Sequence, residues 1–127
     1  MRLGLLSTAR INNAILTGAE GTDRVDVVAV GSRDEAKAQA YATEHRLERS
    51  HGSYEALLED PEVDGVYISL PNSLHHAWTM HALAAGKHVL CEKPYSRSPA
   101  EVEEAYDAGG AAGLLLAEAF MSRHNPQ

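Results

Sequence analysis

The sequence predicts one α/β domain built on a doubly wound parallel sheet of about six strands. Two observations predict this fold. Short apolar runs alternate with segments that carry helical signals, and most of these runs are continuously apolar, which is typical of strands that helices cover on both faces. Right-handed crossovers turn such an order into a parallel sheet. The expected strands are residues 3–6, 25–30, 49–51, 66–70, 87–90 and 114–119.

Each segment between two expected strands carries signals for the start or the end of a helix. Asp34 is an N-cap for a helix that runs to His45, and Ser98 followed by Pro99 opens the last helix. The run from 109 to 113, rich in glycine, is expected to be a flexible turn into the last strand. The expected helices are residues 11–18, 34–45, 53–59, 73–86 and 98–107.

Composition bounds the class of protein. The chain has 127 residues, of which 44% are hydrophobic and 23% charged, so it suits a single packed core. Its formal net charge is −7 and it has no Lys/Arg-rich run, which argues against a nucleic-acid partner. No apolar run is long enough for a membrane span or a signal peptide, and Cys91 is the only cysteine. We therefore expect a cytoplasmic protein without a disulfide.

The histidines do not predict a metal site. His75, His76 and His81 are not three or four residues apart, which is the spacing that places two ligands on one helical face. Cys91 is expected to be a small buried residue, and Trp78 is expected to pack in the core. No metal is therefore expected.

The turn after the first strand is the first candidate binding element. A doubly wound sheet binds ligands at the carboxyl ends of its strands, where the strand order reverses between the first and fourth strands. Ser7, Ala9 and Asn12 stand where a dinucleotide fingerprint has three glycines. Serine and alanine are nearly as small as glycine, and Ser7, Thr8 and Asn12 can donate to a phosphate at the helix N-terminus. The alternative is an ordinary turn with an N-cap.

The turn after the second strand indicates which dinucleotide would bind. Ser32 occupies the position where an acidic residue would accept hydrogen bonds from the free ribose hydroxyls of NAD. Serine can donate to a phosphate, and Arg33 can pair with it. This pair favours NADP, with NAD still open. In the alternative interpretation Arg33 is a solvated turn residue.

Two further turns converge on the same edge. After the fourth strand, Pro71 holds the chain extended, and Asn72 offers a short polar group that could line a ribose or the nicotinamide amide. After the fifth strand come Glu92 and Lys93. A lysine there can exchange a proton with a substrate oxygen while a carboxylate tunes it. A surface ion pair is the alternative.

Several motifs together resemble the glucose-fructose oxidoreductase and inositol dehydrogenase family (Gfo/Idh/MocA). The motifs that carry the resemblance are Glu92-Lys93-Pro94 after residues 85–90, Pro71-Asn72 with His75 after residues 63–68, residues 54–58, and the ending 118–127. They follow the family's order along essentially the whole chain. The first turn and the ending are most similar to the branch of dihydrodiol dehydrogenases and NADP-dependent xylose dehydrogenases.

The resemblance implies a Rossmann-type NAD(P)-binding domain over residues 1–120 and hydride transfer between NADP(H) and a hydroxyl-bearing carbon of a sugar, polyol or cyclic diol. It places Lys93 beside the nicotinamide and substrate, where it assists proton transfer, with Glu92 and Pro94 shaping that turn. Lys93 and Glu92 are the predicted catalytic residues. The predicted cofactor-binding residues are Ser7, Thr8, Ala9, Arg10, Ile11, Asn12, Ser32, Arg33, Leu70, Pro71, Asn72, His75, Glu92, Lys93 and Pro94.

One departure from the family concerns the whole chain. Family members continue into a second α/β domain that builds the substrate pocket, and residues 121–127 are expected to be a tail that leads to such a domain. We therefore expect the chain to bind nucleotide but to turn over poorly alone. The alternative is a non-catalytic NAD(P)-binding or regulatory module. The apolar last strand favours self-association, so a homo-oligomer is expected.

Overall fold

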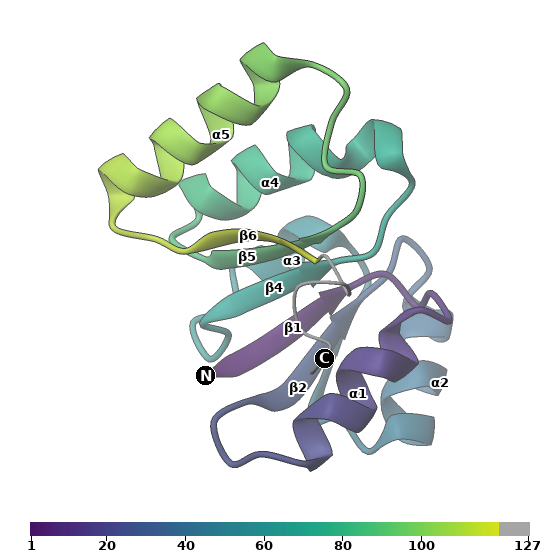
Figure 1. Cartoon of the computed structure of the whole chain (residues 1–127). Coiled ribbons are helices and arrows are strands. Elements are labelled where there is room, and N and C mark those ends of the chain that lie inside the picture. Colours follow the sequence, from purple (N-terminus) through teal and green to yellow (C-terminus); the bar gives the residue numbers. More distant parts are fainter. Residues whose placement is uncertain (120–127) are drawn as a thin grey trace.

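The sheet has the predicted parallel, doubly wound topology. The computed structural model describes residues 1–119, so the expected tail lies outside the described residues. Six parallel strands follow the order β3-β2-β1-β4-β5-β6, which reverses between β1 and β4 (Figure 1). The strands are β1 (Arg2–Leu6), β2 (Asp26–Gly31), β3 (Arg49–His51), β4 (Gly65–Ile68), β5 (His88–Glu92) and β6 (Leu116–Ala119).

Helices cover both faces of the sheet. Figure 1 shows α1 and α2 on one face and α4 and α5 on the other. Each face has its own apolar core, because side chains alternate along every strand: Leu5 and Tyr67 pack on the α1 side, and Leu6 and Ile68 on the α4 side. The helices are α1 (Asn12–Glu20), α2 (Glu35–His45), α3 (Tyr54–Leu58), α4 (His75–Ala84) and α5 (Pro99–Ala112), with a 3₁₀ turn at Asn72–Leu74.

The predicted N-caps are present, and one glycine lets a helix approach the sheet. The side chains of Asp34, Ser53 and Ser98 accept hydrogen bonds from backbone N–H groups in the first turns of α2, α3 and α5. A Cβ on Gly4 would lie 2.9 Å from a methyl carbon of Leu57 in α3. Glycine at this position therefore allows α3 to pack tightly on β1.

The prediction of a flexible turn at 109–113 is wrong. Helix α5 continues through Gly109 and Gly110 to Ala112. It ends at Gly113, whose φ is +69°, and the N–H of Leu114 closes the end by donating to the carbonyl of Gly109. Two helical glycines lower helix propensity without forbidding the helix, since the packing of α5 on α4 supplies the stability.

The ends of several other helices and strands differ by one or two residues from the ends predicted from the sequence. Helix α1 continues past Gly18 to Glu20, β4 ends at Ile68, and β5 extends to Glu92. The stretch expected as one helix over 73–86 is divided into the 3₁₀ turn and α4. These shifts place Ser69 in a loop and Glu92 on a strand.

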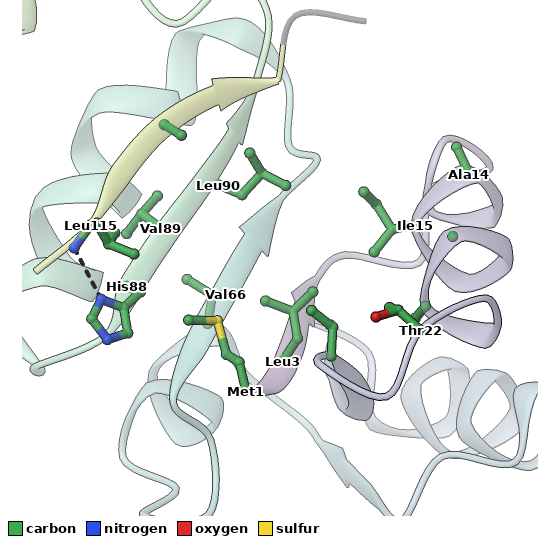
Figure 2. A pocket seen from close by; sticks show the side chains of 14 residues that line it. Met1, Leu3, Ala14, Ile15, Thr22, Val66, His88, Val89, Leu90 and Leu115 are labelled. Atoms are coloured by element: carbon green, nitrogen blue, oxygen red, sulfur yellow. Dashed lines mark hydrogen bonds between the residues drawn. The ribbon is translucent and has the colours of Figure 1, made fainter. Parts of the chain in front are cut away.

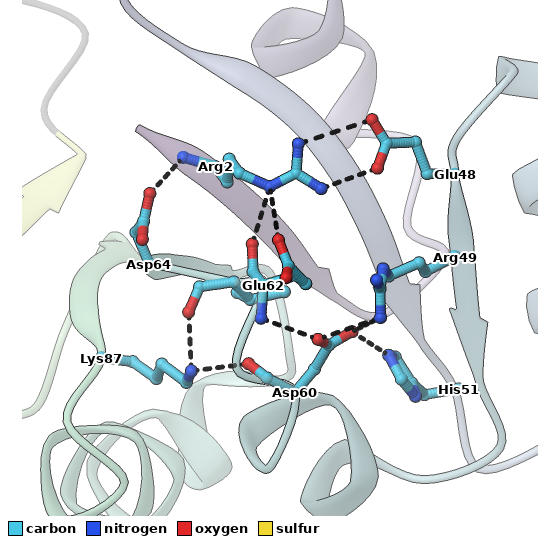
Figure 3. Close-up of polar contacts among 9 residues, drawn as sticks. Arg2, Glu48, Arg49, His51, Asp60, Glu62, Asp64 and Lys87 are labelled. Carbon is cyan, nitrogen blue, oxygen red and sulfur yellow. Dashed lines mark hydrogen bonds and ion pairs between the residues drawn. The ribbon is translucent and has the colours of Figure 1, made fainter.

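A polar network ties the amino edge of the sheet together (Figure 3). The carboxylate of Asp60 is almost fully buried and accepts hydrogen bonds from Arg49 and from the Glu62 N–H, and its Oδ2 lies 2.9 Å from His51 Nε2. The buried Lys87 Nζ donates to the carbonyls of Asp60 and Val63, at 2.7 and 2.6 Å. The connection between α3 and β4 is thereby fixed to β3 and β5.

The α1 side of the sheet is only partly covered. Figure 2 shows an apolar hollow between α1 and the strands β4–β6. Its volume is about 360 Å³, and the residues that line it include Leu3, Ile15, Val66, Leu90 and Leu115. Within residues 1–119 no helix covers the β5–β6 part of this face. None of the described helices is long and apolar enough to cross a membrane.

Candidate functional site

A polar hollow lies at the carboxyl edge of the sheet, where the strand order reverses. Its volume is about 520 Å³, and the segments that follow β1, β2, β3 and β4 line it. The lining residues are Ser7, Thr8, Ala9, Ser32, Arg33, Asp34, Lys37, Tyr54, Ser69, Leu70 and Pro71. The structure thus brings three of the four predicted turns to one place, as expected for ligand binding at a topological switch point.

The first turn (residues 7–12) is held by an internal hydrogen-bond network. Ser7 has a φ of +124°, a conformation that glycine adopts much more readily. Its hydroxyl accepts from the N–H of Ala9 and, at 2.7 Å, donates to Ser69 Oγ, which in turn donates to Asn12 Oδ1 at 2.7 Å. Asn12 Nδ2 donates to the Ser7 carbonyl at 2.8 Å. Ser7 therefore takes the place of the first glycine of the fingerprint.

Asn12 differs from its predicted role. It has no exposed surface, and both ends of its amide are bound within the network, so it orders the turn and offers nothing to a phosphate. Helix α1 also has no side-chain cap. The N–H groups of Thr8, Arg10 and Ile11 have no acceptor among residues 1–119. Free N–H groups at a helix N-terminus are the donors that an anion needs, so the structure does not have the alternative N-capped turn.

The turn after β2 adds two cations. The buried Ser32 hydroxyl accepts from the N–H of Asp34, whose side chain caps α2. The exposed Arg33 and Lys37 both line the hollow, and neither forms an ion pair within the described part of the chain. Sequence reasoning missed Lys37, although its place in the first turn of a helix that Asp34 caps was a usable signal.

The turn after β4 contributes Ser69, Leu70 and Pro71 to the hollow. Sequence reasoning also missed Ser69, which links this turn to the first turn through Ser7 and Asn12. These hydrogen bonds join residues 57 and 62 positions apart, so no local signal marks Ser69. Asn72 is exposed and lines a neighbouring polar hollow of about 470 Å³ together with Pro94.

The end of β5 presents an oriented carboxylate beside an exposed lysine. The Tyr67 hydroxyl donates to Glu92 Oε1 at 2.5 Å, and the backbone N–H of Lys93 donates to Glu92 Oε2 at 3.1 Å. Burial and the adjacent carboxylate raise the pKa of Tyr67 well above its ordinary value, so its hydroxyl remains a donor. The Lys93 ammonium forms no ion pair within residues 1–119. Glu92 and Lys93 therefore do not form the surface ion pair that was the alternative interpretation of these two residues.

Arg10, Ile11 and His75, which the sequence predicts as cofactor-binding residues, do not line the polar hollow. Arg10 and Ile11 are exposed beside the first turn. His75, at the start of α4, is fully buried, so it has no surface with which to contact a cofactor directly. The resemblance implies a cofactor-binding role for His75, which this burial does not allow by direct contact.

Two expectations about packing are confirmed. Cys91 is buried, and burial raises the pKa of its thiol to about 12. Trp78 packs edge-on against Tyr54, with ring centroids 5.1 Å apart. Among the described residues there is no group of three or more His, Cys, Asp or Glu side chains that could hold a metal ion.

Comparisons with known proteins agree with this fold and site. D-xylose 1-dehydrogenase (NADP(+)) 2 from Haloferax volcanii is 44% identical over 99% of this chain and 39% of that protein. Trans-1,2-dihydrobenzene-1,2-diol dehydrogenase from Homo sapiens is 38% identical over 99% of this chain and 38% of that protein. The crystal structure of KijD10, a 3-ketoreductase from Actinomadura kijaniata in complex with NADP and TDP-benzene, matches with a TM-score of 0.93 and 38% identity, over 100% of this chain and 39% of that chain.

The chain matches only part of the length of each of these relatives. It spans 38–39% of the length of these relatives. The family described as "Oxidoreductase family, NAD-binding Rossmann fold" (Gfo/Idh/MocA) matches residues 4–120. The sheet order, the first turn and this match agree, and the chain belongs to the Gfo/Idh/MocA oxidoreductase family, whose NAD-binding Rossmann domain it forms.

Proposed function

We propose that the polar hollow binds NADP, with preference over NAD. The observation that carries this proposal is that two cations, Arg33 and Lys37, line the part of the hollow after β2 and form no ion pair within residues 1–119. Ser32, which precedes Arg33, stands at the position where NAD-binding sites have an acidic residue for the ribose hydroxyls. Two cations there favour the additional 2′-phosphate of NADP, because a phosphate gains charge-assisted hydrogen bonds from both.

The remaining residues fit the rest of the dinucleotide. The N–H groups of Thr8, Arg10 and Ile11, which have no acceptor in the described part of the chain, suit the pyrophosphate at the N-terminus of α1. Ala9 leaves room for the phosphates beside the backbone, as glycine does in the fingerprint. Leu70 and Pro71 form the apolar wall of the hollow toward the nicotinamide half, next to the Asn72 side chain.

We further propose hydride transfer between NADP(H) and a hydroxyl-bearing carbon of a sugar, polyol or cyclic diol as the activity of the whole protein. When bound, the nicotinamide would supply the acceptor or donor of the hydride. In the reductive direction the exposed Lys93 ammonium holds the substrate oxygen and donates a proton to it as the hydroxyl forms, and in the oxidative direction the neutral Lys93 amine takes up that proton. Glu92, fixed by Tyr67, orients the backbone at Lys93. Relatives that are named for xylose, for a dihydrodiol and for a 3-keto group support this substrate class.

Calorimetric titration of the purified chain with NADP and with NAD tests the cofactor proposal. We expect NADP to bind more tightly than NAD, and Arg33→Ala and Lys37→Ala each to weaken NADP binding about tenfold while leaving NAD binding nearly unchanged. Arg24→Ala, an exposed arginine on the opposite edge, is the control and should change neither affinity. Equal binding of the two nucleotides, or variants that weaken both alike, would contradict the assignment of the two cations.

A further inference from the structure

His75 is a buried imidazole with two backbone partners. It has no exposed surface, and its ring nitrogens lie 2.9 Å (Nδ1) from the Pro94 carbonyl oxygen and 2.7 Å (Nε2) from the Leu70 carbonyl oxygen. Both distances are those of good hydrogen bonds. A carbonyl oxygen only accepts, so a ring nitrogen that carries a hydrogen donates to the carbonyl oxygen that it faces.

The two carbonyls belong to the two loops at the nicotinamide end of the proposed site. Leu70 precedes Pro71 in the polar hollow, and Pro94 directly follows Lys93. The pairing of β4 with β5 ends at Ile68 and Cys91. Beyond that pair the sheet ladder no longer sets the distance between the two loops, and the His75 ring lies between them instead.

We propose that His75 is a positioning residue that joins these two loops across the end of the sheet, and thereby holds the nicotinamide end of the site preformed. The proposal rests on the proposed function, because it assigns the nicotinamide to these loops. The other end of the site has its own support, since Ser32 and the Asp34 cap hold the turn that carries Arg33 and Lys37, and no hydrogen bond joins this turn to His75 within residues 1–119. Loss of the imidazole should therefore affect one half of the dinucleotide.

The test compares two ligands on four proteins. NADPH reaches both ends of the site, whereas 2′,5′-ADP reaches only the end at Arg33 and Lys37. The proteins are the wild-type chain, His75→Phe, which removes both ring nitrogens, His75→Gln, which retains an amide donor, and His81→Gln, which changes an exposed histidine on the same helix. Binding of each ligand is measured by calorimetric titration, and binding of NADPH also by the change in its nicotinamide fluorescence.

We expect His75→Phe to bind NADPH about tenfold more weakly and with a smaller fluorescence change, with unaltered affinity for 2′,5′-ADP. His75→Gln should recover part of the NADPH affinity, and His81→Gln should match the wild type. Equal weakening of both ligands by His75→Phe would indicate a general loss of structure and overturn the proposal. Unaltered NADPH binding would overturn it as well.

Hydrogen exchange of the ligand-free chain separates this proposal from the cofactor assignment. The backbone amides of residues 69–74 and 93–96 should exchange faster in His75→Phe and in His75→Gln, while those of residues 34–37, after β2, keep the wild-type rate. Unchanged exchange at both loops would overturn the link that His75 forms. A wild-type chain that binds neither nucleotide would contradict the proposed function, and the exchange rates would still decide the role of His75.

Discussion

The backbone conformation and hydrogen bonds of Ser7 explain why a serine can stand at the position of the first glycine of the dinucleotide fingerprint. A positive φ at a non-glycine residue costs on the order of 1–3 kcal/mol and persists only where the surroundings enforce it. Here the hydroxyl that glycine lacks bonds Ser69 and the N–H of Ala9. The side chain that strains the turn also fastens it to the loop after β4, the strand beside β1 in the sheet. The fingerprint fails as a sequence motif, yet its geometry is retained.

Asp60 is the buried charge on which the amino edge depends. Burial by itself would raise the pKa of this carboxyl, but the Glu62 N–H, the His51 ring and Arg49 favour its ionised form more strongly, so its pKa lies below the ordinary value of 3.8. A carboxyl with a lowered pKa stabilises the fold above its unfolded-state pKa. That contribution disappears as the pH falls through the folded-state pKa.

Asp60→Asn tests this account. We expect the variant to lose about 2 kcal/mol of unfolding free energy at neutral pH, because hydrogen bonds to a buried carboxylate are lost. Below pH 3.8 the difference from the wild type should narrow, since the wild-type carboxyl is then becoming neutral too. Urea unfolding at several pH values measures both. Glu48→Gln, at the exposed pair with Arg2, is the control and should cost less; a difference that persists in acid would refute the account.

Helix α5 shows how an element can differ from its sequence signals. Two adjacent glycines suggested an end near Asp107, but the helix continues to Ala112 and a third glycine, Gly113, provides the left-handed end. A Cβ at Gly110 would meet nothing within 4 Å, whereas any side chain at Gly113 would be strained by its φ of +69°. The same residue type therefore has opposite effects three positions apart.

The stabilities of the variants Gly110→Ala and Gly113→Ala distinguish a continuous helix from a flexible turn. We expect Gly110→Ala to stabilise the chain by about 0.5–1 kcal/mol, because alanine is the better helix former, and Gly113→Ala to destabilise it by about 1 kcal/mol. Thermal unfolding of both variants measures the pair. A Gly110→Ala variant no more stable than the wild type would contradict a continuous α5.

The type and order of the elements were predictable because these signals are local. Buried strands require continuous apolar runs, and Asp34, Ser53 and Ser98 cap helices through bonds to residues three positions away. Element ends were less predictable. The last residues of β4, β5 and α5 depend on which neighbours they pair or pack with, and those neighbours are distant in sequence.

At the scale of the whole molecule, the partly covered α1 face is the main exposed apolar feature. Its hollow of about 360 Å³ is bordered by Leu115, which is 67% exposed, and by β6 at the edge of the sheet. Apolar surface beside a sheet edge favours association. The expectation of self-association from the sequence therefore stays a prediction, now with a defined surface.

Leu115→Lys tests that surface. We expect the purified chain to show concentration-dependent association in light scattering, and the variant to show less, because a charge at the hollow opposes its burial. Tyr106→Lys replaces an exposed aromatic residue of α5, which packs on the other face of the sheet, and should leave association unchanged. A wild-type chain that remains monomeric at high concentration would contradict the prediction.

The sequence by itself determined the doubly wound sheet and the edge at which the cofactor turns meet, because strand burial, caps and chain order are local or topological properties. Only the tertiary structure decided which side chains face that edge. Asn12 and His75 turn inward and hold loops, whereas Lys37 and Ser69 line the hollow. Whether a polar side chain is buried and bonded depends on backbone groups that folding brings near it, and these partners, such as Leu70 and Pro94, cannot be identified from spacing along the chain.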